Sequence, residues 1–78
     1  MKVRFYGRLA DAIGREIELD VRHEAPVGEI RRSLAASHPG AAGALRLSRA
    51  CVRDIMADDN RLLSANDDLE FLPPVSGG

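Results

Sequence analysis

The last six residues of the chain, Pro73-Pro74-Val75-Ser76-Gly77-Gly78, have the types and spacing best suited to chemistry. Each proline fixes its φ angle and lacks an amide donor, so Pro73 and Pro74 stiffen the exit from the preceding segment. Glycine has no side chain, so Gly77 and Gly78 can enter a slot too narrow for a Cβ. A chain that ends at Gly78 carries a free α-carboxylate at this slender tip. A frayed terminus is the alternative, and the strand-like run directly before the tail disfavours it.

The other reactive side chains are better explained by structure than by chemistry. Cys51 is the only cysteine, lies in a predicted strand, and is interpreted as a small buried thiol. His23 and His38 lie far apart in predicted loops, and a metal site needs more ligands, so we expect none. The acidic pairs Asp58-Asp59 and Asp67-Asp68 are interpreted as turn polarity, because adjacent strand residues face opposite ways. We therefore expect no catalytic residue within the chain itself.

The charge balance excludes several classes of protein. The 78 residues include 11 Lys plus Arg and 12 Asp plus Glu, for a net charge of −1. A nucleic-acid binder normally concentrates positive charge, so we expect no nucleic-acid partner. The sequence has no run of about 20 apolar residues and no signal-peptide pattern, so we expect no membrane association and a cytoplasmic location. Five arginines suggest a basic edge, interpreted as an ion-paired surface, with a docking patch for an acidic partner left open: Arg31, Arg32, Arg46, Arg49 and Arg53.

The first half of the chain predicts a hairpin followed by a helix. Apolar and polar residues alternate over residues 2–6 and again over 16–22, which is typical of two half-buried strands joined by a turn region at 7–14. Pro26 is expected to open a helix, with Val27, Ile30 and Leu34 on its apolar face and Glu29, Arg31 and Arg32 largely away from it. The helix is expected to end at His38-Pro39-Gly40.

The second half predicts further strands. Residues 40–44 fit either a loop or a loose helical turn, and Leu45 and Leu47 are expected to lead into a strand near 50–53. Residues 58–60 indicate a turn, and Leu62-Leu63 fits either a helical turn or a strand. Asn66-Asp67 indicates another turn, where Asn tolerates the left-handed conformation. Residues 68–72 alternate as a last strand.

The order β-β-α-β-β predicts an α+β fold. It matches a ubiquitin-like β-grasp with a mixed sheet, one main helix on one face, a domain at 1–72 and an extended tail at 73–78. In a β-grasp the first and last strands are neighbours, so Tyr6 and Leu72 should meet on the outer sheet face. Two isolated surface apolar residues are the alternative, and a contact site for a partner is favoured.

The β-grasp order, residues 67–72 and residues 73–78 resemble the MoaD-type small subunit of molybdopterin synthase, a member of the MoaD/ThiS ubiquitin-like sulfur carriers. The similarity covers essentially the whole chain, including Val3-Arg4-Phe5-Tyr6-Gly7 and the helix after Pro26. The resemblance implies that an E1-like enzyme uses ATP to adenylate Gly78, which a sulfur donor protein then helps convert to a thiocarboxylate. The tail, Pro73 to Gly77 with Gly78 at its tip, would enter the large synthase subunit and give sulfur to the pterin precursor. No tightly bound cofactor is implied.

Other functions fit the same tail. A sulfur carrier for thiamine or cysteine synthesis shares its chemistry, as does a ubiquitin-like modifier joined to lysines through Gly78. A passive β-grasp binding module would not need the two glycines at all. The chain also departs from the family pattern in two places, with Val52-Arg53 where the family commonly has Val-Asn and Asn66-Asp67-Asp68 where it has Gly-Asp-Glu.

Overall fold

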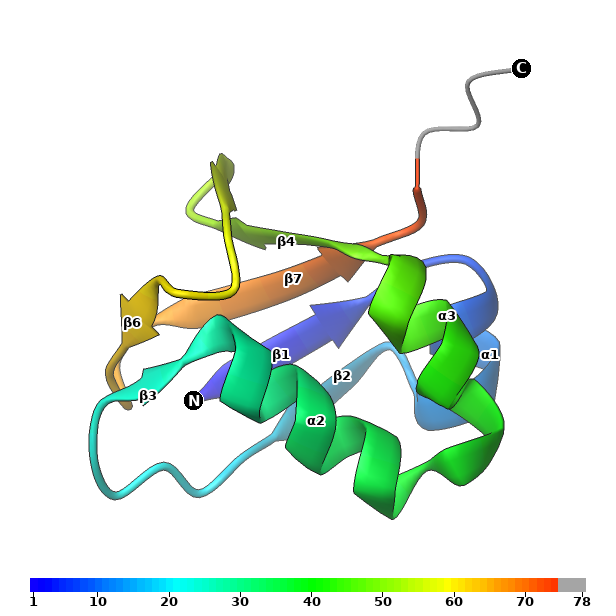
Figure 1. Cartoon of the computed structure of the whole chain (residues 1–78), viewed down its shortest axis with the longest axis horizontal. Coiled ribbons are helices and arrows are strands. Elements are labelled where there is room, and N and C mark those ends of the chain that lie inside the picture. The colour runs from blue at the N-terminus through cyan, green and yellow to red at the C-terminus, as the bar shows by residue number, and fades with distance from the viewer. Residues whose placement is uncertain (75–78) are drawn as a thin grey trace.

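The computed structural model describes residues 1–74, which form two sheets and a layer of helices (Figure 1). The larger sheet has five strands in the order β2-β1-β7-β4-β5. Its strands are β1 (Lys2–Phe5), β2 (Glu16–Glu18), β4 (Arg49–Val52), β5 (Ile55–Ala57) and β7 (Asp68–Leu72), and a small sheet pairs β3 (Ala25–Pro26) with β6 (Leu62–Leu63). The helices α1 (Arg8–Ile13), α2 (Val27–Ser37) and α3 (Ala42–Leu47), with the 3-10 turn η1 (Pro39–Ala41), cover one sheet face.

The first and last strands lie side by side, as the sequence predicted. β1 pairs with β7 in parallel, Val3 opposite Leu69 and Phe5 opposite Phe71. β1 also pairs antiparallel with β2, and β7 pairs antiparallel with β4, so the sheet is mixed and β7 is its central strand. The predicted α+β, ubiquitin-like fold class is confirmed.

The core lies between the sheet and the helices. Alternate residues of the strands point inward, because successive strand side chains face opposite ways. Phe5 and Phe71 stack at its centre, with ring centroids 5.8 Å apart and planes inclined by 10°. The other fully buried large side chains are Val3, Val27, Leu34, Leu45, Val52, Leu63 and Leu69. The predicted helix face is confirmed, since Val27, Ile30 and Leu34 all lie in the core.

Two predictions in the first half were wrong. The expected turn region contains α1, a six-residue helix that begins after Gly7 and ends at Gly14, both with positive φ, and buries Leu9. The strand expected over 16–22 ends at Glu18. The register places Glu18 opposite Lys2, the first residue of β1, and Leu19 donates its amide hydrogen to the Met1 carbonyl. β1 therefore has no residue left to pair with residues 20–22.

The region between α2 and β4 also differs from the prediction. Leu45 and Leu47 belong to α3 and do not lead directly into a strand. α2 itself begins at Val27, with Pro26 as its N-cap in extended conformation. Leu62-Leu63, left open between helix and strand, is strand β6.

The strand β5 was missed because its turn lacks the usual residues. β4 and β5 form a hairpin with Val52 opposite Ile55, joined by Arg53 and Asp54 alone. Both residues have positive φ, 52° and 66°, which Asn-Gly would normally supply. The turn before β7 was predicted correctly, although Asn66 is not among the described residues with positive φ. The division into a 1–72 domain and a 73–78 tail stays a prediction.

Candidate functional site at the root of the C-terminal tail

The tail leaves the domain from its central strand. β7 is hydrogen-bonded on both sides, and its Phe71 is fully buried against Phe5. Pro73 and Pro74 follow directly and are exposed. A strand held on both edges is the most rigid attachment that a sheet offers, so the position of the tail root is well fixed. The predicted roles of Val75, Ser76, Gly77 and Gly78 fall on residues outside those that the structure describes.

Arg31 of α2 holds the inner side of β7. Its guanidinium carbon lies 5.2 Å from the centroid of the Phe71 ring. Nη1 donates to the carbonyl oxygen of Leu45, and to the carbonyl oxygen and Oγ of Ser48 at 2.9 Å each, while Nη2 lies 3.1 Å from Oδ1 of Asp59. The prediction that Arg31 lies away from the apolar face was therefore wrong. Arg31 joins α2, the end of α3 and the β5–β6 loop around the ring that anchors the tail.

On the outer sheet face, Tyr6 and Leu72 come together as predicted. Phe5 lies opposite Phe71, so the following residues, Tyr6 and Leu72, are neighbours. Tyr6 is 40% exposed, Leu72 is half-buried, and the Tyr6 hydroxyl donates a hydrogen bond to Oε2 of Glu70. That bond to the carboxylate is the main cause that raises the pKa of Tyr6, since it favours the protonated phenol. The proximity is confirmed, and the partner contact stays a prediction.

A cleft lies at the tail root on the side of the helices. Its volume is about 590 Å³, and it is formed by Tyr6, Arg8, Leu9, Leu47, Pro73 and Pro74 together with Gly7 and Ala44. A Cβ built on Gly7 would lie 3.5 Å from Cγ of Pro73, so the β1–α1 junction lies beside the first tail residue. The sequence interpretation missed Arg8 and Leu47. The alanine-rich run before Leu47 was the available signal, because alanine favours helix.

The arginines of the predicted basic edge behave differently from one another. Arg31 pairs with Asp59, and Nη2 of Arg53 lies 3.4 Å from Oδ1 of Asp67. Arg32, Arg46 and Arg49, and also Arg8, make no ion pair with any residue of 1–74. The interpretation as an ion-paired surface therefore holds, within the described part of the chain, for Arg31 and Arg53 and not for the other three arginines of the predicted edge.

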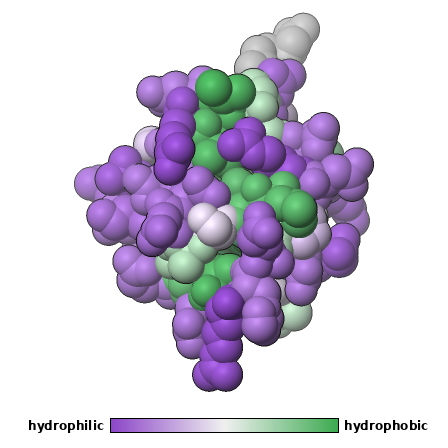
Figure 2. All heavy atoms as spheres, turned by 90° about the vertical axis from the view of Figure 1, so that its left-hand side faces the viewer, coloured by the Kyte–Doolittle hydropathy of each residue, from purple (hydrophilic) through white to green (hydrophobic). Residues whose placement is uncertain are grey.

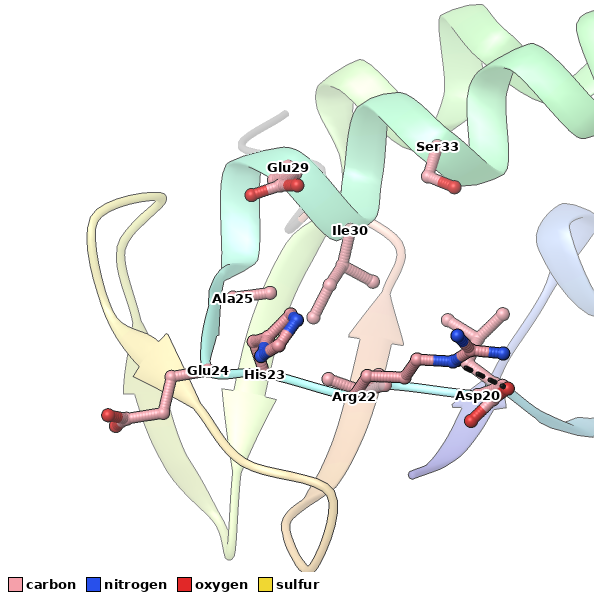
Figure 3. Close-up of a pocket in the computed structure, with 10 residues that line it drawn as sticks. Asp20, Arg22, His23, Glu24, Ala25, Glu29, Ile30 and Ser33 are labelled. Atoms are coloured by element: carbon pink, nitrogen blue, oxygen red, sulfur yellow. Dashed lines mark ion pairs between the residues drawn. The ribbon is translucent and has the colours of Figure 1, made fainter.

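A second cavity, of about 230 Å³, lies between the 19–25 segment and α2 (Figure 3). Ile30 and His23 point into it, whereas Glu24 points away. Asp20 and Arg22 form a largely exposed ion pair, Nε to Oδ2 at 3.8 Å. Among the described residues no cluster of His, Cys, Asp and Glu could hold a metal ion. The polar groups of this cavity do not converge on one point, so it is a weaker candidate than the tail root.

Cys51 is buried, as predicted, and its Sγ lies 3.3 Å from Sδ of Met56. Met56, Ile55 and Leu62 are exposed apolar side chains on the β5 and β6 side of the molecule, away from Tyr6 and Leu47 at the tail root. Figure 2 looks onto this side and shows apolar patches between hydrophilic ones. No helix within residues 1–74 is long and apolar enough to cross a membrane.

The sequence pattern of the ThiS family matches residues 3–78. The chain belongs to the ThiS family. The match includes the tail and the strand that carries it, so the resemblance to the MoaD/ThiS ubiquitin-like sulfur carriers is confirmed. No curated protein sequence matches the chain at a significant level.

Solved structures place this ThiS-family chain among several small β-grasp proteins. It is 26% identical to small archaeal modifier protein 1 (SAMP1) of Haloferax volcanii, with a TM-score of 0.77, covering 99% of this chain and 97% of that one. A protein assigned as molybdopterin converting factor subunit 1 of Pyrococcus furiosus is 18% identical, with a TM-score of 0.82 and 95% of each chain covered. In a complex of subunits 1 and 2 of the Helicobacter pylori molybdopterin-converting factor, the matching chain is 24% identical, with a TM-score of 0.68 and 99% and 96% covered. The last two likenesses show the fold.

Proposed function

We propose that this protein is the sulfur-carrying small subunit of a molybdopterin synthase and acts in the cytoplasm. The position of the tail root and the extent of the family match support the proposal together. The Pro73-Pro74 root projects from the central strand beside Tyr6 and Leu72, and the family match extends through Gly77 and Gly78. This arrangement suits a rigid handle with a narrow arm, and such an arm suits delivery of a terminal group into a buried site.

The chemistry requires activation of the Gly78 carboxylate, because an unactivated carboxylate has no good leaving group. In the proposed sequence, an E1-like enzyme binds ATP, a carboxylate oxygen attacks the α-phosphorus and pyrophosphate leaves. A donor protein then supplies sulfur as hydrosulfide, which attacks the carbonyl carbon; the C–O bond to AMP breaks, AMP leaves, and a thiocarboxylate remains. The carrier needs no tightly bound cofactor, since ATP is used by the activating enzyme.

The length of the tail fits delivery into a partner. Six residues, Pro73 to Gly78, span at most about 20 Å when fully extended. Prolines at the root restrict the free conformations of the arm, which lowers the entropy lost when the arm enters a channel. In the proposed complex Tyr6 and Leu72 contact the large subunit, while Gly77 and Gly78 pass the narrowest part of its channel.

The decisive test is the intact mass of the protein after incubation with an E1-like enzyme, ATP and a sulfur donor. We expect a gain corresponding to one oxygen replaced by sulfur, located at Gly78 by fragmentation. A variant that lacks Gly77-Gly78 is the control and should gain nothing. Failure of the wild-type protein to gain sulfur, while an authentic carrier does so in the same mixture, would refute the proposal.

The acceptor is decided by reconstitution. The thiocarboxylated protein is mixed in turn with a large synthase subunit and pterin precursor, with a thiazole synthase, and with a cysteine synthase of the sulfur-carrier type. We expect sulfur to be released to the pterin precursor. Release to one of the other two acceptors alone would keep the carrier function and overturn the assignment to molybdopterin synthesis.

A protein modifier is the second candidate, favoured by the 26% identity to SAMP1 over nearly the whole chain. In this function Gly78 would form an isopeptide bond with a lysine of another protein. Lys2 is the only lysine in this sequence, so polymeric chains of the modifier on itself are disfavoured. Gly-Gly remnants on lysines of cellular proteins, lost when Gly78 is deleted, would support the modifier.

A further inference from the structure

Leu47 is exposed without any evident structural need. It is the last residue of α3 and 65% exposed, whereas Leu45, two residues earlier, is fully buried and anchors the helix. An exposed leucine alone is ordinary on a protein surface. This one, however, forms a wall of the tail-root cleft together with Tyr6 and the two prolines.

Two walls of the cleft are Pro73 and Pro74, the first residues of the tail. A protein that takes up the tail therefore comes close to this cleft as well as to Tyr6 and Leu72 on the sheet face. The Pro73 ring lies beside Gly7, and Leu9 is buried. The cleft is thus formed before binding, which reduces the ordering cost of filling it.

The cleft also contains a positive charge. Arg8 lies on its wall and makes no ion pair with any residue of 1–74. An apolar cleft with one arginine is complementary to an apolar side chain with a carboxylate beside it. Charge at the edge of an interface acts mainly on association rate and on the choice of partner.

We propose that the tail-root cleft receives an apolar side chain, flanked by an aspartate or glutamate, from the large synthase subunit. This inference rests on the proposed function and adds Leu47 and Arg8 to the contact made by Tyr6 and Leu72. The large subunit then holds the root from both sides, with the sheet face on one side and the end of α3 on the other. The tail enters its channel at a fixed angle.

The experiment uses the full chain and the large subunit encoded by the same organism, with affinity measured by calorimetry at several salt concentrations. Leu47→Ala is compared with Leu62→Ala, a 55% exposed leucine on β6 outside the cleft. Arg8→Gln is compared with Arg32→Gln, an exposed arginine of α2. Thiocarboxylation by the activating enzyme is followed by mass for every variant.

We expect Leu47→Ala to weaken binding about tenfold. A tenfold change in Kd corresponds to the burial of less than two methylene groups, and the substitution removes more apolar surface than that. Arg8→Gln should weaken binding about fivefold at low salt and flatten its salt dependence. Both control variants should bind like wild type, and all four should be thiocarboxylated normally.

Three outcomes would overturn the inference. If the cleft variants bind like their controls while wild type binds and is thiocarboxylated, the docking site is wrong and the function stands. If the cleft variants lose thiocarboxylation but keep their affinity for the large subunit, the cleft serves the activating enzyme instead. If wild type gains no sulfur or does not bind the large subunit, the proposed function falls and the inference with it.

Discussion

Arg31 offers the most direct test of how the tail root is held. The substitution Arg31→Met keeps a long unbranched stem and removes the guanidinium. The stem can still pack against the ring of Phe71, but the bonds to Leu45, Ser48 and Asp59 are lost. The Leu45 carbonyl oxygen keeps two donors, the Ser48 hydroxyl at 2.6 Å and the Ser48 amide at 3.2 Å, while the Ser48 carbonyl oxygen loses the arginine.

The size of the effect follows from these contacts. Hydrogen bonds from a charged donor contribute about 1.5–3 kcal/mol, and the stacking of a cation on a ring adds about 0.5–2 kcal/mol. The ion pair adds less than about 1 kcal/mol because Asp59 is 60% exposed. These contributions overlap, so we expect Arg31→Met to lower the free energy of unfolding by about 3 kcal/mol, or the melting temperature by about 12–24 °C.

The matched control is Arg32→Met on the same helix. Arg32 is exposed and makes no ion pair with the residues that the structure describes, so its loss should change stability by less than about 0.5 kcal/mol. Urea unfolding followed by circular dichroism measures both variants. A difference between them below about 1 kcal/mol would refute the view that Arg31 is the inner support of β7.

Three further predictions concern the outer face and two turns. Tyr6 is the only tyrosine and there is no tryptophan, so phenolate absorbance reports it alone. We expect Tyr6 to titrate with a midpoint above the ordinary tyrosine pKa, and we expect the Glu70→Ala substitution to lower that midpoint. Because the pKa of Tyr6 is raised in the folded protein, its hydrogen bond to Glu70 stabilises the fold at neutral pH, and this stabilisation is lost as the pH rises through the midpoint. Equal midpoints would contradict this. Gly7 has a φ of 59°, so Gly7→Ala should lower the free energy of unfolding by about 1–3 kcal/mol. Gly40→Ala is the control and should cause no such loss, because a Cβ at Gly40 would meet open space. Equal losses in the two variants would show that the positive φ of Gly7 is unimportant. Replacing Arg53-Asp54 with Asn-Gly should raise the free energy of unfolding by about 1 kcal/mol, measured in urea, and a loss would show that the ion pair of Arg53 outweighs the backbone strain.

The elements that the sequence could predict are those with strong periodicity. β1, α2 and β7 each show one apolar face over several residues, and that face is set by burial in the core. The parallel pairing of β1 with β7 then brings Tyr6 beside Leu72, and both predictions are confirmed. The chemistry assigned to the tail came from residue types and family resemblance, and it stays a prediction.

The parts that the sequence could not give depend on tertiary contacts. β5 follows a turn of Arg53 and Asp54, both with positive φ; aspartate tolerates this conformation, but arginine rarely adopts it. Arg31 occupies a helix position that looks solvent-facing, and only the end of α3 and the ring of Phe71 supply its partners. The cleft required α3 to be recognised as a helix, because Leu47 forms a wall of it only from that helix end.

The position of the tail root bears on how such a carrier selects its partners. An activating enzyme and a sulfur acceptor would both have to accept the same Gly77-Gly78 tip, which offers no side chain to distinguish them. Specificity is a difference between affinities, so it must come from side chains that the partners contact outside the tip. Two surfaces at the root share Tyr6 and otherwise differ in chemistry: Leu72 lies on the sheet face, and Leu47 and Arg8 border the cleft on the helix side. Since β7 fixes both surfaces relative to the same two prolines, each partner can weight them differently and still receive the tail in the same place.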